Sequence, residues 1–389
     1  MRRKVCVVTG SRAEYGLLSL LLQKLKDSSV LTLQLVATGM HLSPEFGLTY
    51  REIEADGFEL DAKVESLVSS DTPVGIAKSM AMTLMSIGEV FNTLTPDIVV
   101  VLGDRFEIFA ATAAAHVARI PVAHIHGGEV TEGAFDDAFR HSITKMSHLH
   151  FTATEEYRRR VIQLGEHPDR VHTVGALGID SIRNLKRLSR GELQRSLGIR
   201  FAGRNILITF HPVTLENNTS QRQMTNLLSA LETMNNTNCF FTKANADAHG
   251  RIINEMIDAF VENHPERAFG FTSLGQLRYL SLMSHVDCVL GNSSSGIVEA
   301  PSLRKPTINI GRRQEGRLRA ASVVDCNPER NAIIDALELV FSEPFQEKLK
   351  NVVNPLGDGN ASERICRMLE DADFKRVSLK RFYDVNQSD

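Results

Sequence analysis

The chain has 389 residues, which exceeds the usual range of a single domain, about 250–300 residues, and therefore predicts two domains. A hydrophobic fraction of 42% is enough for complete cores, and a net charge of −3 provides no general attraction to nucleic acid or membranes. Five scattered cysteines without CxxC pairing argue against a zinc ribbon or a disulfide framework and indicate reduced thiols in a cytoplasmic protein.

Apolar strands alternate with longer amphipathic segments through the first half of the chain. The apolar runs have the length of strands, so no membrane-spanning segment is expected. Strands followed by helices are the signature of parallel strands that are buried on both faces. We expect strands within residues 4–11, 31–39, 96–105, 120–128 and 148–154, and a last one that begins near residue 171.

The same rhythm restarts in the second half. The chain is therefore predicted to be an α/β protein with two Rossmann-like sheets in tandem, followed by a last helix within residues 357–374 and a loose polar tail. The strands of the second half are expected within residues 205–213, 239–247, 268–275, 287–296 and 306–311.

Unusual polar residues follow many of these strands. Ligands of open α/β sheets bind beyond the carboxyl ends of the strands, so we expect the two sheets to face one cleft. The residues at these ends are Arg12, His41, Asp104, His126, Glu129, His211, Asn245 and Ser293–Ser295.

A Gly–Ser loop at residues 291–296 predicts a phosphate site. Its N–H groups and the hydroxyls of Ser293 and Ser294 suit a pyrophosphate, although a plain N-cap serine run is the alternative. Glu299 follows in the helix and suits two ribose hydroxyls, unless it is a surface residue. Arg12 suits bidentate phosphate binding, and its alternative is a structural pair with Glu14.

Residues 124–145 carry three competing interpretations: a metal site, an acid–base site, and a solvated loop whose charges have no function. A metal site would use histidines that share a face of a strand, such as His124 and His126, but it needs a third ligand and explains no phosphate feature. An acid–base site fits better, because His126, Glu129 and Asp136 would crowd one strand end near Asp104. Asp104 alone could also be a helix cap.

One further histidine stands at a strand end in the second half. His211 precedes a proline, which excludes a regular continuation of its strand, and this favours a functional histidine over a core one.

Motifs along nearly the whole chain resemble the hydrolysing UDP-N-acetylglucosamine 2-epimerases of sialic-acid biosynthesis, in the bacterial capsule-pathway branch. They are GSRAEYGLL, GDRFE, HIHGGEVTEGAFDDAFRHSITKMSHLHF, FHPVT, NAD, GNSSSGIVEAPSLRKPTINIGRRQEGR and FYDV. The resemblance implies the GT-B fold, with an N-terminal domain at residues 1–176 that a C-terminal helix at 359–375 rejoins, a UDP-binding domain at 177–358, and a polar tail at 376–389.

The reaction that the resemblance implies turns UDP-GlcNAc and water into UDP and N-acetylmannosamine. Anti elimination of UDP gives 2-acetamidoglucal, and syn addition of water then gives the inverted C2 centre. No metal or nicotinamide cofactor is implied. Relatives form homodimers or homotetramers through the first domain, and the apolar helix predicted at residues 76–91 is a candidate surface, although it equally suits the core.

The resemblance also implies roles for single residues. Arg12, Ser293 and Ser294 match positions that hold the diphosphate, and Glu299 matches the ribose clamp. The remaining matches are Arg105, His211 and Asn245 for substrate phosphate or sugar, Arg313 for the ligand, Asp104 and Asp136 for acid–base chemistry, and Arg140 for a nearby structural or binding role.

One departure leaves the proton-abstracting group open. Many relatives read H-x-E at the strand end, with the glutamate thought catalytic, whereas this chain has His126 there. His126, Glu129 and Asp136 are therefore all candidates.

Four other functions are compatible with parts of the pattern. The first is the same hydrolysing chemistry on UDP-N,N'-diacetylbacillosamine, or its GDP analogue, in a legionaminic-acid pathway. The others are a non-hydrolysing epimerase, a GT-B glycosyltransferase, and an inactive nucleotide-sugar sensor.

Overall fold

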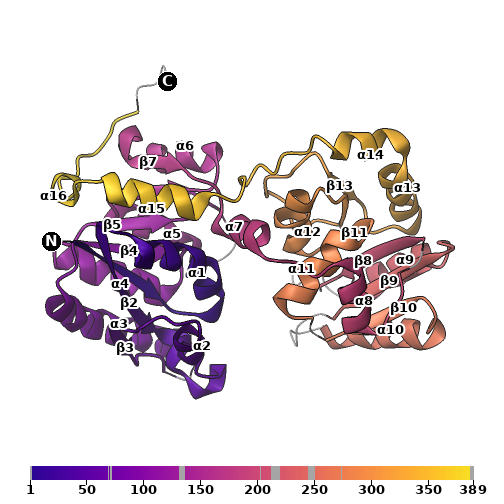
Figure 1. Ribbon diagram of the computed structural model, residues 1–389, viewed down its shortest axis with the longest axis horizontal. Helices are drawn as coiled ribbons and strands as arrows, with labels where there is room; N and C mark the ends of the chain where they lie inside the picture. Colours follow the sequence, from indigo (N-terminus) through magenta and orange to yellow (C-terminus); the bar gives the residue numbers. More distant parts are fainter. Residues whose placement is uncertain are drawn as a thin grey trace. The chain divides into compact units, whose positions relative to one another are not determined.

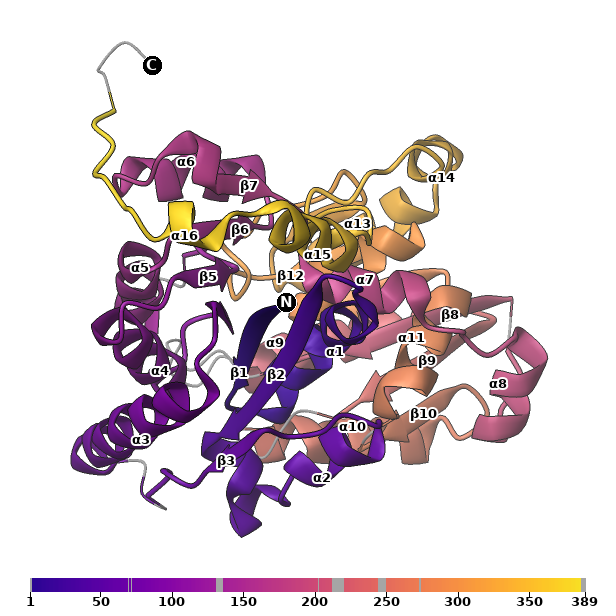
Figure 2. The same ribbon diagram turned by 60° about the vertical axis from the view of Figure 1, so that its left-hand side comes forward.

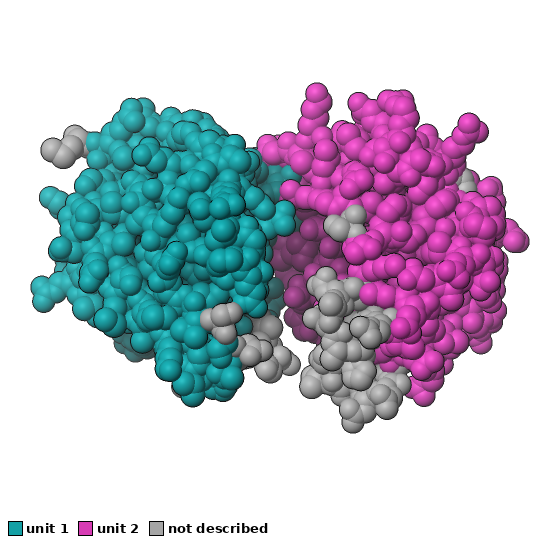
Figure 3. Space-filling view, turned by 90° about the horizontal axis from the view of Figure 1, so that it is seen from below, with its two compact units in different colours: residues 1–181, 359–389 teal, residues 182–358 magenta. Residues whose placement is uncertain are grey.

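The computed structural model describes residues 2–68, 70, 72–130, 136–201, 203–211, 220–243, 250–272 and 274–385. The chain divides into two compact units, which Figure 3 colours separately: unit 1 contains residues 1–181 and 359–389, and unit 2 contains residues 182–358. The division falls after Ser181, whereas the sequence led us to expect it after residue 176. Both units are parallel α/β sheets, which confirms the predicted fold class.

Unit 1 is built on a seven-stranded parallel sheet in the order β3-β2-β1-β4-β5-β6-β7 (Figure 1). Val5 and Val7 of β1 belong to the core on one face, and Cys6 and Val8 belong to the core on the other. Burial on both faces explains the continuous apolar runs in the sequence. The strands are β1 Arg3–Thr9, β2 Leu31–Thr38, β3 Ala62–Val64, β4 Ile98–Leu102, β5 Val122–Ile125, β6 Leu149–Thr152 and β7 Val171–Thr173.

Helices cover both faces of this sheet. Helix α1 begins with a capping box, in which the Ser11 hydroxyl accepts from the Glu14 N–H and the Glu14 carboxylate accepts from the Ser11 N–H. The helices of the first segment are α1 Arg12–Asp27, α2 Tyr50–Ala55, α3 Pro73–Leu94, α4 Phe106–Val117, α5 Asp136–Met146, α6 Glu155–Gln163 and α7 Leu177–Asn184, and a 3₁₀ turn, η1, spans Gly39–Leu42.

Helix α3 is the one long apolar helix among the described residues. By length and composition it could cross a membrane, with a mean hydropathy of 1.3 in its best window, of which 28% is buried. Its buried residues fall on one stripe that includes Ser79, Thr83, Ile87 and Phe91, and the helix packs against α4. This spacing is that of a helix on the surface of a globular core, and α3 also leaves Met85 69% exposed.

The C-terminal helix α15, Ala361–Asp371, returns to unit 1 and packs against α1 (Figures 1 and 2). Its first N–H groups are capped by the buried carboxylate of Asp180, which accepts from Ala361 at 2.9 Å and from Ser362 at 2.6 Å. Its side chains complete the same core that β1 and α1 form, so unit 1 is made from two distant parts of the sequence.

Over residues 374–383 the segment after α15 is held to unit 1 by several contacts. A short helix, α16, spans Phe374–Val377, and the Arg170 guanidinium donates to two carbonyl oxygens in and after it. The Lys380 ammonium donates to two carbonyl oxygens at the end of α5 at 2.5 and 2.6 Å and lies 2.8 Å from the Glu166 carboxylate. The Tyr383 N–H donates to the Gly165 carbonyl at 2.9 Å.

Unit 2 contains a six-stranded parallel sheet in the order β10-β9-β8-β11-β12-β13. Its strands are β8 Arg204–Thr209, β9 Thr237–Thr242, β10 Ala268–Phe271, β11 Cys288–Gly291, β12 Thr307–Ile310 and β13 Val323–Cys326. Its helices are α8 Arg190–Leu197, α9 Ser220–Leu231, α10 Gly250–Asn263, α11 Gly275–His285, α12 Ser294–Val298, α13 Arg330–Phe341 and α14 Glu343–Leu349.

Candidate functional site

The predicted acid–base residues of unit 1 gather around one arginine. Arg140 lies on α5 and is 7% exposed, and its guanidinium pairs with the carboxylate of Asp104, which follows β4. The same guanidinium donates to the His126 carbonyl at 3.3 Å and lies 3.5 Å from the Glu129 carboxylate. A buried arginine needs such partners, and it thereby fixes three predicted site residues relative to one another.

His126 occupies the turn after β5 in a left-handed conformation, with φ at 66°, which costs a non-glycine residue energy. Its backbone N–H donates to the Phe151 carbonyl at 2.9 Å and holds the turn against β6. Its ring Nε2 accepts from the Leu177 N–H at 3.4 Å, which places the ring proton on Nδ1, 3.3 Å from the Glu129 carboxylate. The ring is therefore oriented from both sides.

Asp136, the first residue of α5, has a different environment. Partial burial raises the pKa of its carboxyl group, and the nearby Asp104 carboxylate raises this pKa further. Within the described residues Asp136 has no ion-pair partner, whereas Asp104 is paired with Arg140. Asp104 is thus paired with a neighbouring cation, whereas the raised pKa of Asp136 brings it closer to exchanging a proton near neutral pH.

The two predicted substrate-binding arginines of unit 1 differ in how firmly they are held. Arg105 caps α4 and donates through Nε to the fully buried Glu107 carboxylate at 2.6 Å, and through Nη2 to the Met40 sulfur at 3.3 Å. Arg12 is mostly exposed and pairs with Glu52 of α2 at 2.9 Å. The alternative partner that the sequence offered for Arg12 was Glu14, and Glu14 instead caps α1.

His41 lies at a strand end as predicted but does not face solvent. It is fully buried, with its two ring nitrogens 3.1 Å from the Thr9 hydroxyl and 2.8 Å from the Thr49 hydroxyl. Burial lowers its pKa to about 4, so the ring is neutral at physiological pH. Its role is to join β1 to the loop before α2.

The histidines on and beside β5 and β6 other than His126 are structural. His124 is fully buried between the Gly103 carbonyl at 2.8 Å and the Thr144 hydroxyl at 3.1 Å, and burial lowers its pKa to about 3. His148 accepts a backbone hydrogen bond, and His150 contacts a buried glutamate. Among the residues that the structure describes, no group of three or more potential ligands could hold a metal ion.

In unit 2, the predicted phosphate loop follows β11. Gly291 has a φ of 135°, and a Cβ there would lie 2.0 Å from the Thr209 carbonyl oxygen, so only glycine fits this position. The Ser293 hydroxyl accepts from the Ser295 N–H at 3.3 Å and is the N-cap of α12. Ser294 is the first residue of that short helix and is partly exposed.

Glu299 ends α12 and carries an unsatisfied oxygen. Burial raises the pKa of its carboxyl group, against a hydrogen bond from Ser295 that lowers it. Its Oε2 atom is buried and has no hydrogen-bond partner among the described residues. Such an oxygen is costly unless a ligand supplies a donor, and a pair of ribose hydroxyls would do so.

Asn292 organises this region and was not among the residues predicted from the sequence. Asn292 is 1% exposed, and its side chain accepts from the His211 N–H at 2.7 Å and donates to the His211 carbonyl at 2.8 Å. Its own carbonyl accepts from Arg313 at 3.1 Å and from Gln314 at 2.9 Å. Asn292 thus holds both predicted residues, His211 through its side-chain amide and Arg313 through its backbone carbonyl. Asn245, also predicted for this site, lies outside the described residues.

A family model described as UDP-N-acetylglucosamine 2-epimerase matches residues 23–370 of the chain. The chain belongs to this 2-epimerase family. The resemblance inferred from the motifs is therefore confirmed.

Similar proteins come from several bacteria. The chain is 40% identical over 385 residues to a GDP/UDP-N,N'-diacetylbacillosamine 2-epimerase (hydrolyzing) of Campylobacter jejuni, covering 99% of this chain and all of the relative. It is 40% identical to polysialic acid biosynthesis protein P7 of Escherichia coli over 98% of both chains. It is 36% identical to a UDP-N,N'-diacetylbacillosamine 2-epimerase (hydrolyzing) of Legionella pneumophila, over 95% of this chain and 96% of the relative.

Solved structures of 2-epimerases share the fold. A Neisseria meningitidis UDP-GlcNAc 2-epimerase bound to UDP-GlcNAc aligns with a TM-score of 0.77 at 23% identity, over 94% of this chain and 99% of that one. A putative UDP-GlcNAc 2-epimerase of Listeria monocytogenes aligns with a TM-score of 0.80 at 20% identity, over 99% of this chain and all of that one. At these identities the likeness concerns the fold.

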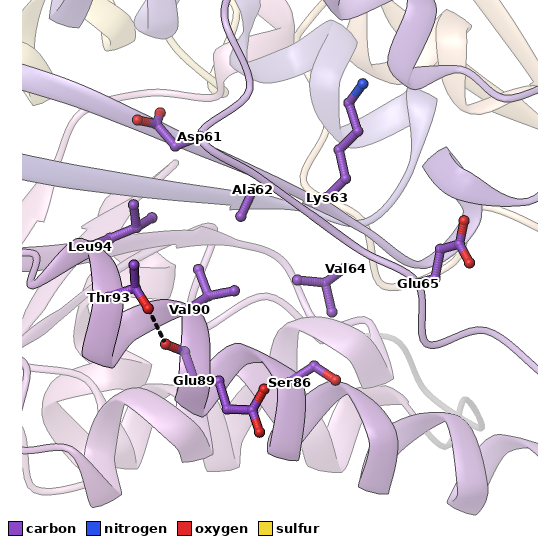
Figure 4. A pocket seen from close by; sticks show the side chains of 10 residues that line it. All are labelled: Asp61, Ala62, Lys63, Val64, Glu65, Ser86, Glu89, Val90, Thr93 and Leu94. Atoms are coloured by element: carbon purple, nitrogen blue, oxygen red, sulfur yellow. Dashed lines mark hydrogen bonds between the residues drawn. The ribbon is translucent and has the colours of Figure 1, made fainter.

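A cavity elsewhere on unit 1 contains none of the predicted site residues. It has a volume of about 390 Å³ and lies between β3 and α3 (Figure 4). Figure 4 shows its side chains to be of mixed character, and the marked hydrogen bond, from the Thr93 hydroxyl to the Glu89 carbonyl, lies within α3. The cavity therefore gives no alternative to the strand-end residues.

Proposed function

We propose that the chain is a hydrolysing 2-epimerase of a UDP-linked 2-acetamido sugar, with UDP-N,N'-diacetylbacillosamine as the first candidate substrate. The observation that supports this most is the near full-length identity, 40% and 36%, to two relatives named as hydrolysing 2-epimerases of that sugar. The sequence analysis placed UDP-GlcNAc first, and these relatives reverse that order.

The proposed reaction has two steps. In the first, the bond between C1 and the diphosphate oxygen breaks, UDP leaves with the bonding electrons, and a base removes the C2 proton to give a glycal. In the second, water adds its hydroxyl group to C1 and a proton returns to C2, which gives the free 2-epimer. Arg12, Ser293 and Ser294 would hold the diphosphate, and fixed positive charge and N–H groups there assist its departure. Glu299 would hold the ribose.

For the acid–base step we favour Asp136 as the group that exchanges the C2 proton. Its raised pKa brings it closer to neutral pH, where general catalysis is most effective, and it has no described ion-pair partner. Asp104 would act as a fixed negative charge, since Arg140 holds it. His126 and Glu129 form an oriented pair beside them and suit the protonation of the glycal.

UDP-GlcNAc is the second candidate substrate. A specific observation favours it: the chain is equally similar, at 40% identity, to a relative named for polysialic acid biosynthesis. The two sugars differ at C4 and C6, so a single chemistry serves both. The cytoplasmic location and the homo-oligomeric state expected from the sequence stay predictions.

The test is proton NMR in deuterated water with UDP-N,N'-diacetylbacillosamine, its GDP analogue and UDP-GlcNAc supplied separately. We expect free UDP and a free 2-epimer that carries deuterium at C2, formed fastest from the first substrate. A product that keeps UDP would instead indicate a non-hydrolysing epimerase. A free sugar with its original hydrogen at C2 would refute the elimination step, and dependence on an added sugar acceptor would indicate a glycosyltransferase.

A further inference from the structure

Two buried glutamates of unit 1 are not used by the reaction above, and one of them, Glu107, lies close enough to Asp136 to feel its charge. Glu14 of α1 is 6% exposed and Glu107 of α4 is fully buried. Both reach Gly10, the residue after β1: the Glu14 carboxylate accepts from the Gly10 N–H at 2.7 Å, and a Cβ at Gly10 would lie 2.5 Å from Glu107 Oε1. The two carboxyl groups therefore meet around a residue that must be glycine.

Their hydrogen bonds leave one oxygen on each group unsatisfied. Glu14 uses Oε2 for the N–H groups of Gly10 and Ser11, and Glu107 uses Oε1 for Arg105. Glu14 Oε1 and Glu107 Oε2 are both buried without a hydrogen-bond partner in the described chain. Carboxylate oxygens can only accept, so two ionised groups could not satisfy each other, whereas one protonated group could donate to its neighbour.

The charges nearby are sufficient for only one carboxylate. Arg105 is the cation in direct contact, at 2.6 Å from Glu107. The other titratable groups that face the pair are His41, which is buried and neutral, and Asp136, which adds negative charge. A second buried anion without a partner would be very costly, and such groups bind a proton instead.

We infer that Glu14 and Glu107 share one proton and that, as positioning residues, they hold Arg105 in the orientation in which it contacts substrate. The second part rests on the proposed function, in which Arg105 binds the substrate phosphate or sugar. Glu107 carries the negative charge, because Arg105 and the first turn of α4 stabilise it there. Glu14 carries the proton. Burial and the charge of Glu107 raise the pKa of Glu14 to about 8. Burial also raises the pKa of Glu107, against its contact with Arg105, so the charge is assigned to Glu107 because of that ion pair.

The inference predicts a difference between wild type and Glu14→Gln, whose amide can donate to Glu107 at every pH. Between about pH 4.5 and 8 the folded wild-type protein holds one proton more than the unfolded chain, so its stability falls as the pH rises. We expect the drop in Tm from pH 5 to pH 8 to be roughly 8–16 °C larger for wild type than for the variant. Glu54→Gln, which changes an exposed glutamate of α2, is the matched control and should follow wild type.

The positioning of Arg105 is tested by KM against pH. In wild type, the proton is lost above pH 8, the pair gains a second charge that competes for Arg105, and KM should rise by up to about tenfold per pH unit. Glu14→Gln should show no such rise. In Glu107→Gln, Arg105 loses its anchor, and KM should be about tenfold higher at all pH values while kcat changes less.

The outcomes separate the two proposals. If Glu14→Gln and wild type have the same Tm profile, the shared proton is refuted, whatever the substrate. If the Tm profiles differ but the KM profiles coincide, the claim about Arg105 is refuted. If no nucleotide sugar is turned over, the proposed function fails, and the Tm comparison still decides the shared proton.

Discussion

The buried ammonium of Lys380 offers a direct test of how the C-terminal segment is attached. Its side chain is 20% exposed, and it meets three oxygens, two carbonyls at the end of α5 and the carboxylate of Glu166, which is 2% exposed. Lys380→Met removes all three interactions and leaves two carbonyls and one carboxylate oxygen with fewer donors.

The free energy of unfolding that Lys380→Met should lose depends on the partners that the oxygens contacting Lys380 keep. Removing one partner of a buried ion pair costs about 3–5 kcal/mol. The loss should be smaller here for two reasons. Lys145 and His150 still contact Glu166 after the substitution. In addition, burial lowers the pKa of Lys380 to about 8, so keeping its ammonium charged already costs free energy in wild type. We therefore expect a loss of about 2–3 kcal/mol, or roughly 4–12 °C in the Tm of unit 1.

Differential scanning calorimetry at pH 7 measures this loss. Lys380→Arg should fall between wild type and Lys380→Met, because a planar guanidinium keeps the charge but cannot place it at the same point. Lys375→Met removes an exposed cation from the same segment and is the matched control, with an expected change below about 0.5 kcal/mol. Equal Tm values for Lys380→Met and Lys375→Met would refute the reasoning.

Three further predictions concern the site and its supports. Asp104→Asn and Asp136→Asn should each abolish turnover and leave UDP affinity near wild type in calorimetric titrations; unchanged turnover in both would reject the acid–base assignment. Gly128→Ala should destabilise unit 1 by more than about 2 kcal/mol in denaturant unfolding, since φ is 80° and its Cβ would lie 2.3 Å from a carbonyl oxygen of α6; a loss below 1 kcal/mol would count against it. Although burial opposes this, hydrogen bonds from His150 and two lysines lower the pKa of Glu166 to about 2. The ionised Glu166 carboxylate therefore stabilises the folded state above pH 4.5, and this stabilisation should be lost as the pH falls through about 2. The Tm of Glu166→Gln should therefore fall less than that of wild type over the same acidic range.

The strand-and-helix pattern predicted most of the fold because parallel strands buried on both faces leave an unmistakable apolar run. Two strands, β3 and β13, were not predicted from the sequence. They have three and four residues and lie at sheet edges, where a strand pairs with one neighbouring strand and carries fewer apolar residues. The attachment of residues 374–380 could not be predicted for a related reason. It depends on single contacts, such as that of Lys380 with Glu166, which no periodicity reveals.

The site was predictable where the chemistry lies at strand ends and unpredictable where it depends on the partners. Asp104, His126 and Glu129 follow β4 and β5, so topology alone brought them to one edge. The resemblance placed Arg140 nearby, but which carboxylates it contacts could be seen only in the structure, because the sequence does not give the rotation of a helix about its axis. Asn292 escaped notice because an asparagine in a Gly–Ser loop is typical of any turn.

The order of elements along the chain has a consequence for biosynthesis. Ile365 and Leu369 of α15 belong to the core that β1 and α1 begin, yet the ribosome makes them after all of unit 2. During synthesis, residues 1–181 therefore leave part of their hydrophobic core exposed until α15 is made. Unit 2 is continuous in sequence and can finish folding before unit 1 does. A nascent chain stalled before residue 359 should bind chaperones through its first 181 residues.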